Sequence, residues 1–220
     1  MSKKIFISRD LKENSIFKSR LTAAGYEVIG ASLVDISSVE FGEFRKTDWI
    51  FFSSKNAVKH FFSRSKVEDG VKLGAIGLGT MKALKEHGYE TSYYGMQSKI
   101  EDTANDFGTL AERKSVLFPQ AKNSLRSIQK HLVDYVKIHD LVVYKNVPKE
   151  NFDIPSTDIL VFTSPMNART YLECYDLEEG QKIVAIGPTT GNTLEIFGAR
   201  EYQMPETFSE QSLAELCLAL

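Results

Sequence analysis

Short runs of apolar residues alternate with stretches of mixed polarity along most of the chain. Runs such as Trp49 to Phe52 and Ile159 to Phe162 are typical of strands that a parallel sheet buries on both faces. The strands expected on this basis span residues 4–8, 26–29, 49–52, 71–76, 91–94, 115–118, 141–144, 159–162 and 183–186. Helical stretches separate most of them, so the pattern predicts an α/β fold with parallel sheets.

The expected helices are stretches in which apolar residues recur at helical spacing behind a Ser, Thr or Asn cap. They run from a cap at Asn14 or Ser15 to Gly25, and over residues 56–62, 80–87, 100–113, 125–133, 190–197 and 212–220. The helix within 100–113 is expected to be broken or capped near Gly108, and Pro119 is expected to end the strand that begins at Ser115. The polar passages 33–44 and 145–157 are interpreted as linkers.

Two patterns occur twice in the chain. The pattern A-I-G-x-x-T-x-x-x-L-x-x-x-G begins at Ala75 and again at Ala185, an offset of 110 residues. The pattern F-x-S-x-x-N-A begins at Phe51 and again at Phe162, an offset of 111. Both offsets are about half of the 220 residues, which indicates an internal duplication. Two domains of about 100 residues each are therefore expected.

Composition narrows the class of protein. Hydrophobic residues make up 42% of the chain and charged residues 25%, as in a globular protein with a buried core. The net charge of −2 gives no basic field for nucleic acid. No apolar run approaches the roughly 18 residues of a membrane span, and no signal peptide precedes the first strand. Two cysteines, Cys174 and Cys217, make no disulfide framework, so we expect a cytoplasmic protein.

Four turns that join a strand to a helix are the candidate binding elements, namely 53–56, 77–80, 164–167 and 187–190. Right-handed crossovers place such turns at the carboxyl edge of a parallel sheet, where ligands of open α/β folds bind. Each would present free backbone N–H groups at the positive end of a helix dipole. The Ser and Asn residues in them could equally be helix caps and nothing more.

The motifs of nucleotide and metal chemistry are missing from the sequence. Gly77 and Gly79 begin a G-x-G-x-x-G pattern, but Lys82 stands where its third glycine would be, and there is no P-loop. No two of the four histidines have metal-ligand spacing. His60 and His87 are expected to be solvated on surface helices. Binding of small carboxylates by backbone N–H groups needs no such motif.

Tyr144 stands at the end of an expected strand, beside the second linker. A tyrosine in this place can simply pack its ring and leave its hydroxyl in water, or it can serve a nearby site. The residues leave both roles open.

The chain resembles the uroporphyrinogen-III synthase family of tetrapyrrole biosynthesis. Four blocks carry the resemblance, and their order and spacing span nearly the whole chain. They are F-F-S-S-K-N-A-V from Phe51, V-V-Y-K from Val142, F-T-S-P-M-N-A from Phe162 and A-I-G-P-T-T from Ala185. Arg9 after the first strand, and Met204-Pro205 before the last helix, also look like the family.

The resemblance implies two Rossmann-like or flavodoxin-like α/β domains joined by a two-stranded β linker. The first domain would be discontinuous, with residues 1–34 and 148–220, and the second would hold residues 38–142. The linkers would lie near 33–44 and 141–157. The expected protein is a monomer with no cofactor and no metal, and it does not bind nucleic acid or membrane.

The resemblance also implies a substrate and a reaction. The substrate is hydroxymethylbilane, a linear tetrapyrrole with eight carboxylates, which the family closes to uroporphyrinogen III with inversion of ring D and loss of water. Tyr144 would be the acid that helps the hydroxyl to leave. The expected substrate-binding residues are Arg9, Ser53, Ser54, Lys55, Asn56, Gly77, Thr80, Ser164, Asn167, Gly187, Thr189 and Thr190. The alternative is a two-lobed protein that binds a small polycarboxylate without chemistry.

Overall fold

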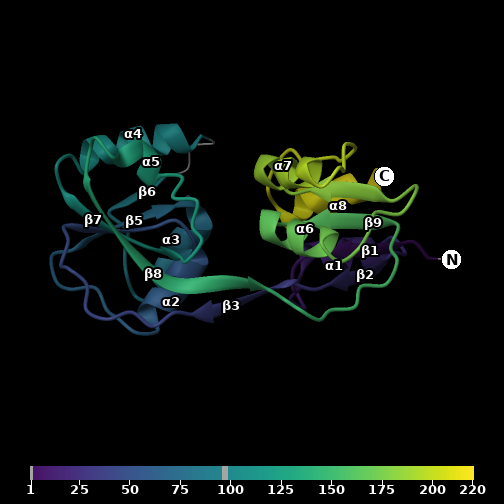
Figure 1. Cartoon of the computed structure of the whole chain (residues 1–220), viewed down its shortest axis with the longest axis horizontal. Helices are drawn as coiled ribbons and strands as arrows, with labels where there is room; N and C mark the ends of the chain where they lie inside the picture. Colours follow the sequence, from purple (N-terminus) through teal and green to yellow (C-terminus); the bar gives the residue numbers. More distant parts are fainter. Residues whose placement is uncertain (1, 96–98) are drawn as a thin grey trace. The chain divides into compact units, whose positions relative to one another are not determined.

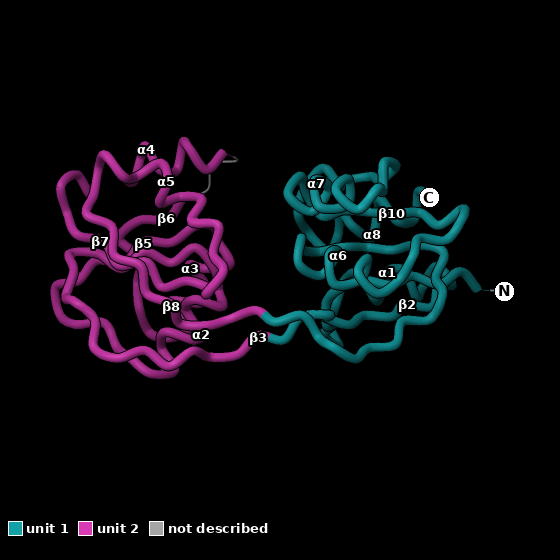
Figure 2. The backbone as a smooth tube through the Cα atoms, viewed as in Figure 1, with its two compact units in different colours: residues 1–35, 147–220 teal, residues 36–146 magenta. Residues whose placement is uncertain are grey.

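The chain forms two compact α/β units in a computed structural model that describes residues 2–95 and 99–220 (Figure 1). Unit 1 consists of residues 1–35 and 147–220, and unit 2 consists of residues 36–146 (Figure 2). Each unit has its own mostly parallel sheet with helices packed against it. The predicted α/β class with two parallel-sheet domains is confirmed.

The sheet of unit 1 has the strand order β10-β9-β1-β2, and all of its pairings are parallel. Its strands are β1 (Lys4–Ile7), β2 (Glu27–Gly30), β9 (Ile159–Phe162) and β10 (Lys182–Ala185). Its helices are α1 (Ile16–Ala23), α6 (Pro165–Leu172), α7 (Pro188–Ile196) and α8 (Glu210–Leu218). Successive side chains of β1 point to opposite faces. Ile5 and Ile7 therefore pack with residues of α1 and α8, while Phe6 packs with residues of α6 and α7.

The sheet of unit 2 has the strand order β3-β8-β7-β4-β5-β6. Its strands are β3 (Val34–Ser38), β4 (Trp49–Phe52), β5 (Lys72–Ile76), β6 (Tyr93–Gly95), β7 (Ser115–Ala121) and β8 (Lys137–Pro148). Its helices are α2 (Lys55–Phe62), α3 (Gly77–Glu86), α4 (Ile100–Leu110) and α5 (Gln129–Leu132). Strand β4 is buried throughout, with Ile50 and Phe52 against α2 and α3, and Trp49 and Phe51 against α4 and α5.

The chain passes from one unit to the other within β3 and again at the end of β8. These two strands are hydrogen-bonded neighbours. The N–H of Val39 donates to the carbonyl of Val143, and the N–H of Lys149 donates to the carbonyl of Leu33, so the two strands run antiparallel. The passage 33–44, interpreted from sequence as a linker, therefore contains a strand.

Two of the duplicated elements match at an offset of 110 residues. Strand β4 corresponds to β9, and helix α2 to α6, with both bounds displaced by 110. The Ser54 cap of α2 (φ −157°, ψ 153°) and the Ser164 cap of α6 (φ −161°, ψ 154°) share one backbone geometry. The predicted offset of 111 for F-x-S-x-x-N-A is therefore wrong by one residue. Asn56 and Asn167 are not equivalent positions.

Each unit combines elements from both copies of the duplication. Strand β1 of the first copy pairs with β2 of the same copy on one side and with β9 of the second copy on the other, and β9 in turn pairs with β10. In unit 2, β4 and β5 of the first copy join β7 and β8 of the second. The repeats in the sequence are thus not the units of the fold.

Three local predictions are wrong or inexact. Helix α4 is not broken at Gly108 but ends soon after it, at Leu110. An added Cβ at Gly108 would lie 2.7 Å from Cγ of Tyr135, so the glycine admits a close ring. Strand β7 continues through Pro119, because its pairing with β4 covers only Val116 and Leu117.

The third wrong prediction is the helix over 125–133, of which only α5, four residues long, is helical. Arg126 adopts a left-handed backbone (φ 54°). Its guanidinium lies 2.8 Å from the carboxylate of Asp140 on β8. A residue in the left-handed conformation cannot be part of a right-handed helix, so no helix begins at residue 125.

Candidate functional site

The carboxyl edge of the sheet in unit 2 brings Tyr144 of β8 to the first turn of α2. The Oη of Tyr144 lies 3.2 Å from Oγ of Ser54. Ser54 also caps α2, since its Oγ accepts a hydrogen bond from the N–H of Ala57 at 3.1 Å. Tyr144 is 7% exposed, so its ring is packed while its hydroxyl reaches a polar partner. The hydroxyl of Tyr144 thus has a polar partner within the protein, and its role at a site stays a prediction.

His60 of α2 packs against the ring of Tyr144. Its ring stacks on that of Tyr144 with centroids 5.4 Å apart and 18° between the planes, and its Nδ1 lies 2.8 Å from Oγ of Ser38 on β3. Burial lowers the pKa of the His60 imidazole, and the positive charge of Lys59 adds to this effect. The prediction that His60 is a solvated surface residue is wrong, because the side chain is 6% exposed. His87 is exposed as expected.

The first turns of α2 and α3 lie close together in unit 2. The side chain of Lys55 runs past Gly79, where an added Cβ would lie 3.5 Å from Cδ of Lys55. Gly77 opens α3 in a left-handed conformation (φ 74°) that favours glycine. Two helix N-termini and one flexible cation therefore meet at this edge.

The remaining predicted residues of unit 2 differ in their accessibility. Ser53 is exposed and Asn56 is half-buried beside the cap of α2. Thr80 is 5% exposed and lies one turn inside α3. Of these three, Ser53 presents the most accessible side chain to a ligand.

In unit 1, the equivalent edge carries Arg9, Ser164 and Asn167. Ser164 caps α6 by accepting from the N–H of Asn167 at 3.2 Å. The Asn167 amide is buried, accepting from the N–H of Leu33 at 2.7 Å and donating to Oγ of Ser164 at 2.8 Å. These bonds tie the start of α6 to the passage before β3. Arg9 is half-exposed and lies 3.7 Å from Glu210.

Gly187, Thr189 and Thr190 form the start of α7 at the same edge of unit 1. Gly187 precedes the helix, and its carbonyl accepts from the N–H of Thr190. Thr189 is exposed, while Thr190 is 1% exposed and faces the core. An added Cβ at Gly187 would lie 3.1 Å from the ring of Phe208, which is itself 71% exposed. Phe208 is a neighbour of the site that no sequence motif indicated.

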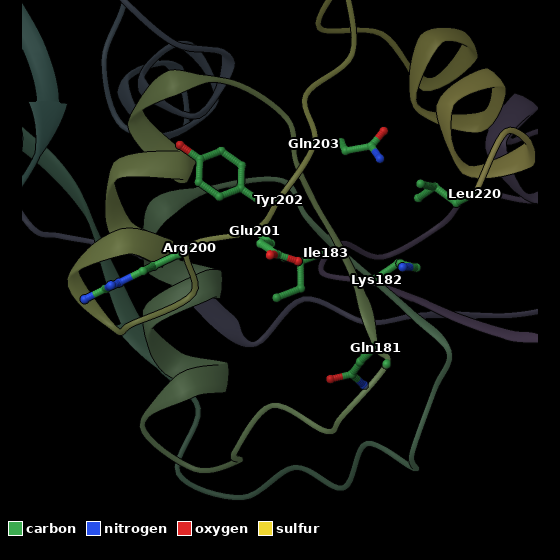
Figure 3. Close-up of a pocket in the computed structure, with 9 residues that line it drawn as sticks. Gln181, Lys182, Ile183, Arg200, Glu201, Tyr202, Gln203 and Leu220 are labelled. Carbon is green, nitrogen blue, oxygen red and sulfur yellow. The ribbon is translucent and has the colours of Figure 1, made fainter.

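A separate hollow of about 400 Å³ lies in unit 1 beside the first residues of β10 (Figure 3). Lys182 begins β10 here, which places the hollow at the edge opposite to Gly187. Figure 3 shows Arg200 and Lys182 on opposite sides of the hollow, with the Arg200 side chain extending away from Lys182. The positive charges that line the hollow therefore do not converge on one point, so the hollow is not a candidate site for an anionic ligand.

Within residues 2–95 and 99–220, no group of three or more His, Cys, Asp or Glu side chains is placed to hold a metal ion. Over the same residues, none of the helices is long and apolar enough to cross a membrane.

Comparison with known proteins decides the family. The family described as uroporphyrinogen-III synthase HemD matches residues 15–215. The chain belongs to the uroporphyrinogen-III synthase family. The predicted family and enzyme class, a hydro-lyase of tetrapyrrole biosynthesis, are thereby confirmed.

Individual relatives agree with this assignment. The uroporphyrinogen-III synthase of Chlorobaculum parvum is 27% identical over 97% of both chains. Among solved structures, the uroporphyrinogen-III synthetase of Helicobacter pylori has a TM-score of 0.77 at 21% identity and covers 100% of this chain and 99% of its own. A mutant uroporphyrinogen-III synthase of Thermus thermophilus has a TM-score of 0.62 at 15% identity, covering 99% and 98%. These structures share the fold.

Proposed function

We propose that this synthase acts on hydroxymethylbilane and that Tyr144 is the acid for departure of the hydroxyl as water. The contact between Tyr144 Oη and Ser54 Oγ carries the proposal. Breaking the C–O bond leaves a cation that the pyrrole nitrogen stabilises, so a weak acid aimed at the oxygen suffices. The phenol proton completes the departing water.

The hydrogen bonds around Ser54 leave a proton available at Tyr144. One lone pair of Ser54 Oγ accepts the Ala57 N–H. The Ser54 hydroxyl can then donate its own proton to Tyr144 Oη. In that arrangement the phenol hydrogen has no protein acceptor in this pair and can donate to the substrate. The ring of Tyr144 stays buried, which fixes the direction of the donor.

Carboxylates of the substrate are proposed to bind at the helix N-termini. In unit 2 the turns before α2 and α3 offer backbone N–H groups beside the Lys55 ammonium. In unit 1 the turns before α6 and α7 and the Arg9 guanidinium offer the same chemistry. Each helix terminus contributes about 0.3–1 kcal/mol to an anion, so several together can select one conformer of a flexible polyanion.

Ser53, Ser54, Asn56, Ser164 and Thr189 would add side-chain hydrogen bonds to these turns. Thr80, Asn167 and Thr190 are more deeply buried and would act by holding the turns in shape. A monomer in the cytoplasm stays a prediction.

The test is an assay of ring closure with hydroxymethylbilane, with the product isomers separated after oxidation to porphyrins. Hydroxymethylbilane closes spontaneously to the symmetric type I ring, so the expected result is type III product formed well above the spontaneous rate. Type I product alone, at the spontaneous rate, would contradict the proposal. A non-catalytic binding protein would instead be stabilised by the carboxylate-rich tetrapyrrole without any turnover.

A further inference from the structure

Three elements of unit 2 meet around the ring of His60. The imidazole comes from α2, its Nδ1 lies 2.8 Å from Oγ of Ser38 on β3, and its face lies against Tyr144 of β8. The near-parallel rings, with centroids 5.4 Å apart, are in the range of offset stacking. His60 is 6% exposed, although histidine has a polar ring that is costly to bury without partners.

We propose that His60 is a positioning residue for the reaction, which holds the Tyr144 phenol in the orientation that presents its hydroxyl to the substrate. This inference rests on the proposed role of Tyr144 and goes beyond it. Ser38 fixes the rotation of the imidazole, and the imidazole covers one face of the phenol. Two contacts then restrain the Tyr144 side chain. Its ring stacks on His60, and its Oη contacts Ser54.

The duplication supplies an internal comparison for this inference. Ser54 has an equivalent in Ser164, which caps α6 in the same geometry, so the cap belongs to both copies. At the same offset of 110, His60 corresponds to Thr170 and Tyr144 to Val34. Neither has a ring, and Thr170 only donates to the carbonyl of Met166 in its own helix. The stacked pair therefore belongs to the unit that carries the proposed acid and is not needed to form the fold.

Holding the Tyr144 phenol in one orientation affects the rate of the reaction. Catalysis by a positioned acid depends on the donor lying within hydrogen-bond distance of the leaving oxygen, and a misplacement of about 1 Å costs on the order of 10²-fold. Loss of the stack should lower kcat and leave KM almost unchanged, because His60 is buried behind Tyr144 and offers no surface to the substrate.

The test compares His60→Ala, His60→Phe and Ser38→Ala in the full chain, each in the wild-type and in the Tyr144→Phe background. Measurements are kcat and KM for hydroxymethylbilane, together with the melting temperature. We expect His60→Ala to lower kcat by about 10-fold or more in the wild-type background, and to change it less than about twofold when Tyr144 is already Phe. His60→Phe keeps a stacking ring but loses the Ser38 contact, so its kcat should fall about as far as that of Ser38→Ala and less than that of His60→Ala.

Ser38→Ala keeps the test decisive if His60→Ala fails to fold, since Ser38 is exposed and its loss opens no cavity. It should lower kcat by about two- to fivefold, again only while Tyr144 is present. Equal losses in both backgrounds, or a full rate for both alanine variants, would overturn the role of His60. A full rate for Tyr144→Phe alone would instead refute the proposed acid, so the two failures are distinguishable.

Discussion

The hydroxyls of Tyr144 and Ser54 lie 3.2 Å apart, although 90 residues separate them along the chain. Ser54 belongs to the first copy of the duplication and Tyr144 to the second. Their contact therefore forms only because unit 2 combines elements of both copies. The proposed acid and the cap that orients it are a product of that exchange.

Tyr144→Phe should reduce turnover by about 10²–10⁴-fold, the range for loss of a positioned acid. The ring and its stack on His60 remain, so the melting temperature and KM should barely change. The remaining product should still be type III, because the turns that bind the carboxylates are intact. Steady-state kinetics with separation of the isomers measures both effects. An unchanged rate would mean that water or a substrate carboxyl supplies the proton.

Ser54→Ala should lower both stability and rate. Losing the cap of α2 costs about 1 kcal/mol in the free energy of unfolding. Losing the partner of Tyr144 Oη should lower kcat as well, by less than Tyr144→Phe does. Ser209→Ala removes the same kind of cap from α8 and calibrates the stability loss. If Ser54→Ala loses stability but keeps the full kcat, Ser54 does not orient the phenol.

The stability of unit 2 should fall in acid because of His60. Burial lowers the pKa of the imidazole in the folded state from its ordinary value of 6.5. Below pH 6.5 the unfolded chain therefore takes up a proton that the folded chain resists. The contribution is fully present above pH 6.5 and is lost as the pH falls toward the folded pKa, by at most about 1.4 kcal/mol per pH unit.

Urea unfolding at several pH values between 5 and 8 measures this effect. His60→Phe should show a smaller loss of stability in acid than the wild type, while His87→Gln, at an exposed histidine, should behave as the wild type does. Equal acid sensitivity of the wild type and His60→Phe would show that other groups cause it.

Cutting the chain between the copies should destroy both units. Residues 1–110 and 111–220 each lack part of a sheet, so we expect insoluble or unfolded halves. Residues 36–146 expressed alone should fold, as should residues 1–35 joined to 147–220 by a short glycine linker. The ends of that junction are close, because the N–H of Lys149 donates to the carbonyl of Leu33. Circular dichroism and cooperative thermal melting distinguish these outcomes.

Cys217 reports on the folding of unit 1 in this experiment. Its thiol is fully buried, and burial raises its pKa to about 12. It should react with a thiol reagent only when unit 1 unfolds, whereas the exposed Cys174 should react at once. If the copies 1–110 and 111–220 fold separately as stable monomers, the assignment of the units is wrong.

The sequence alone was enough to predict the family, the α/β class and most strands, because buried parallel strands are continuous apolar runs. Trp49 to Phe52 is one such run, and the structure has a strand over the same four residues. Helix caps could also be predicted, because their hydrogen bonds are local. The cap of α1 was expected at Asn14 or Ser15, and it is Ser15.

Features that depend on distant contacts could not be predicted. Gly108 lies inside a helix against the ring of Tyr135, and Pro119 continues a strand because β4 stops pairing before it. His60 is polar and lies on an amphipathic helix, so nothing near it in the sequence indicates burial. Its environment comes from Ser38 and Tyr144, more than 20 and 80 residues away.

The exchange of elements between the copies also sets the order in which a newly made chain can fold. Strand β1 leaves the ribosome about 150 residues before its neighbour β9. At roughly 5–20 residues per second, the apolar segment Ile5-Phe6-Ile7 stays without that partner for about 8–30 s, while unit 2 can already be complete. During this time the exposed edge of β1 can pair with strands of other chains, so the cell that synthesises the protein has to prevent such pairing.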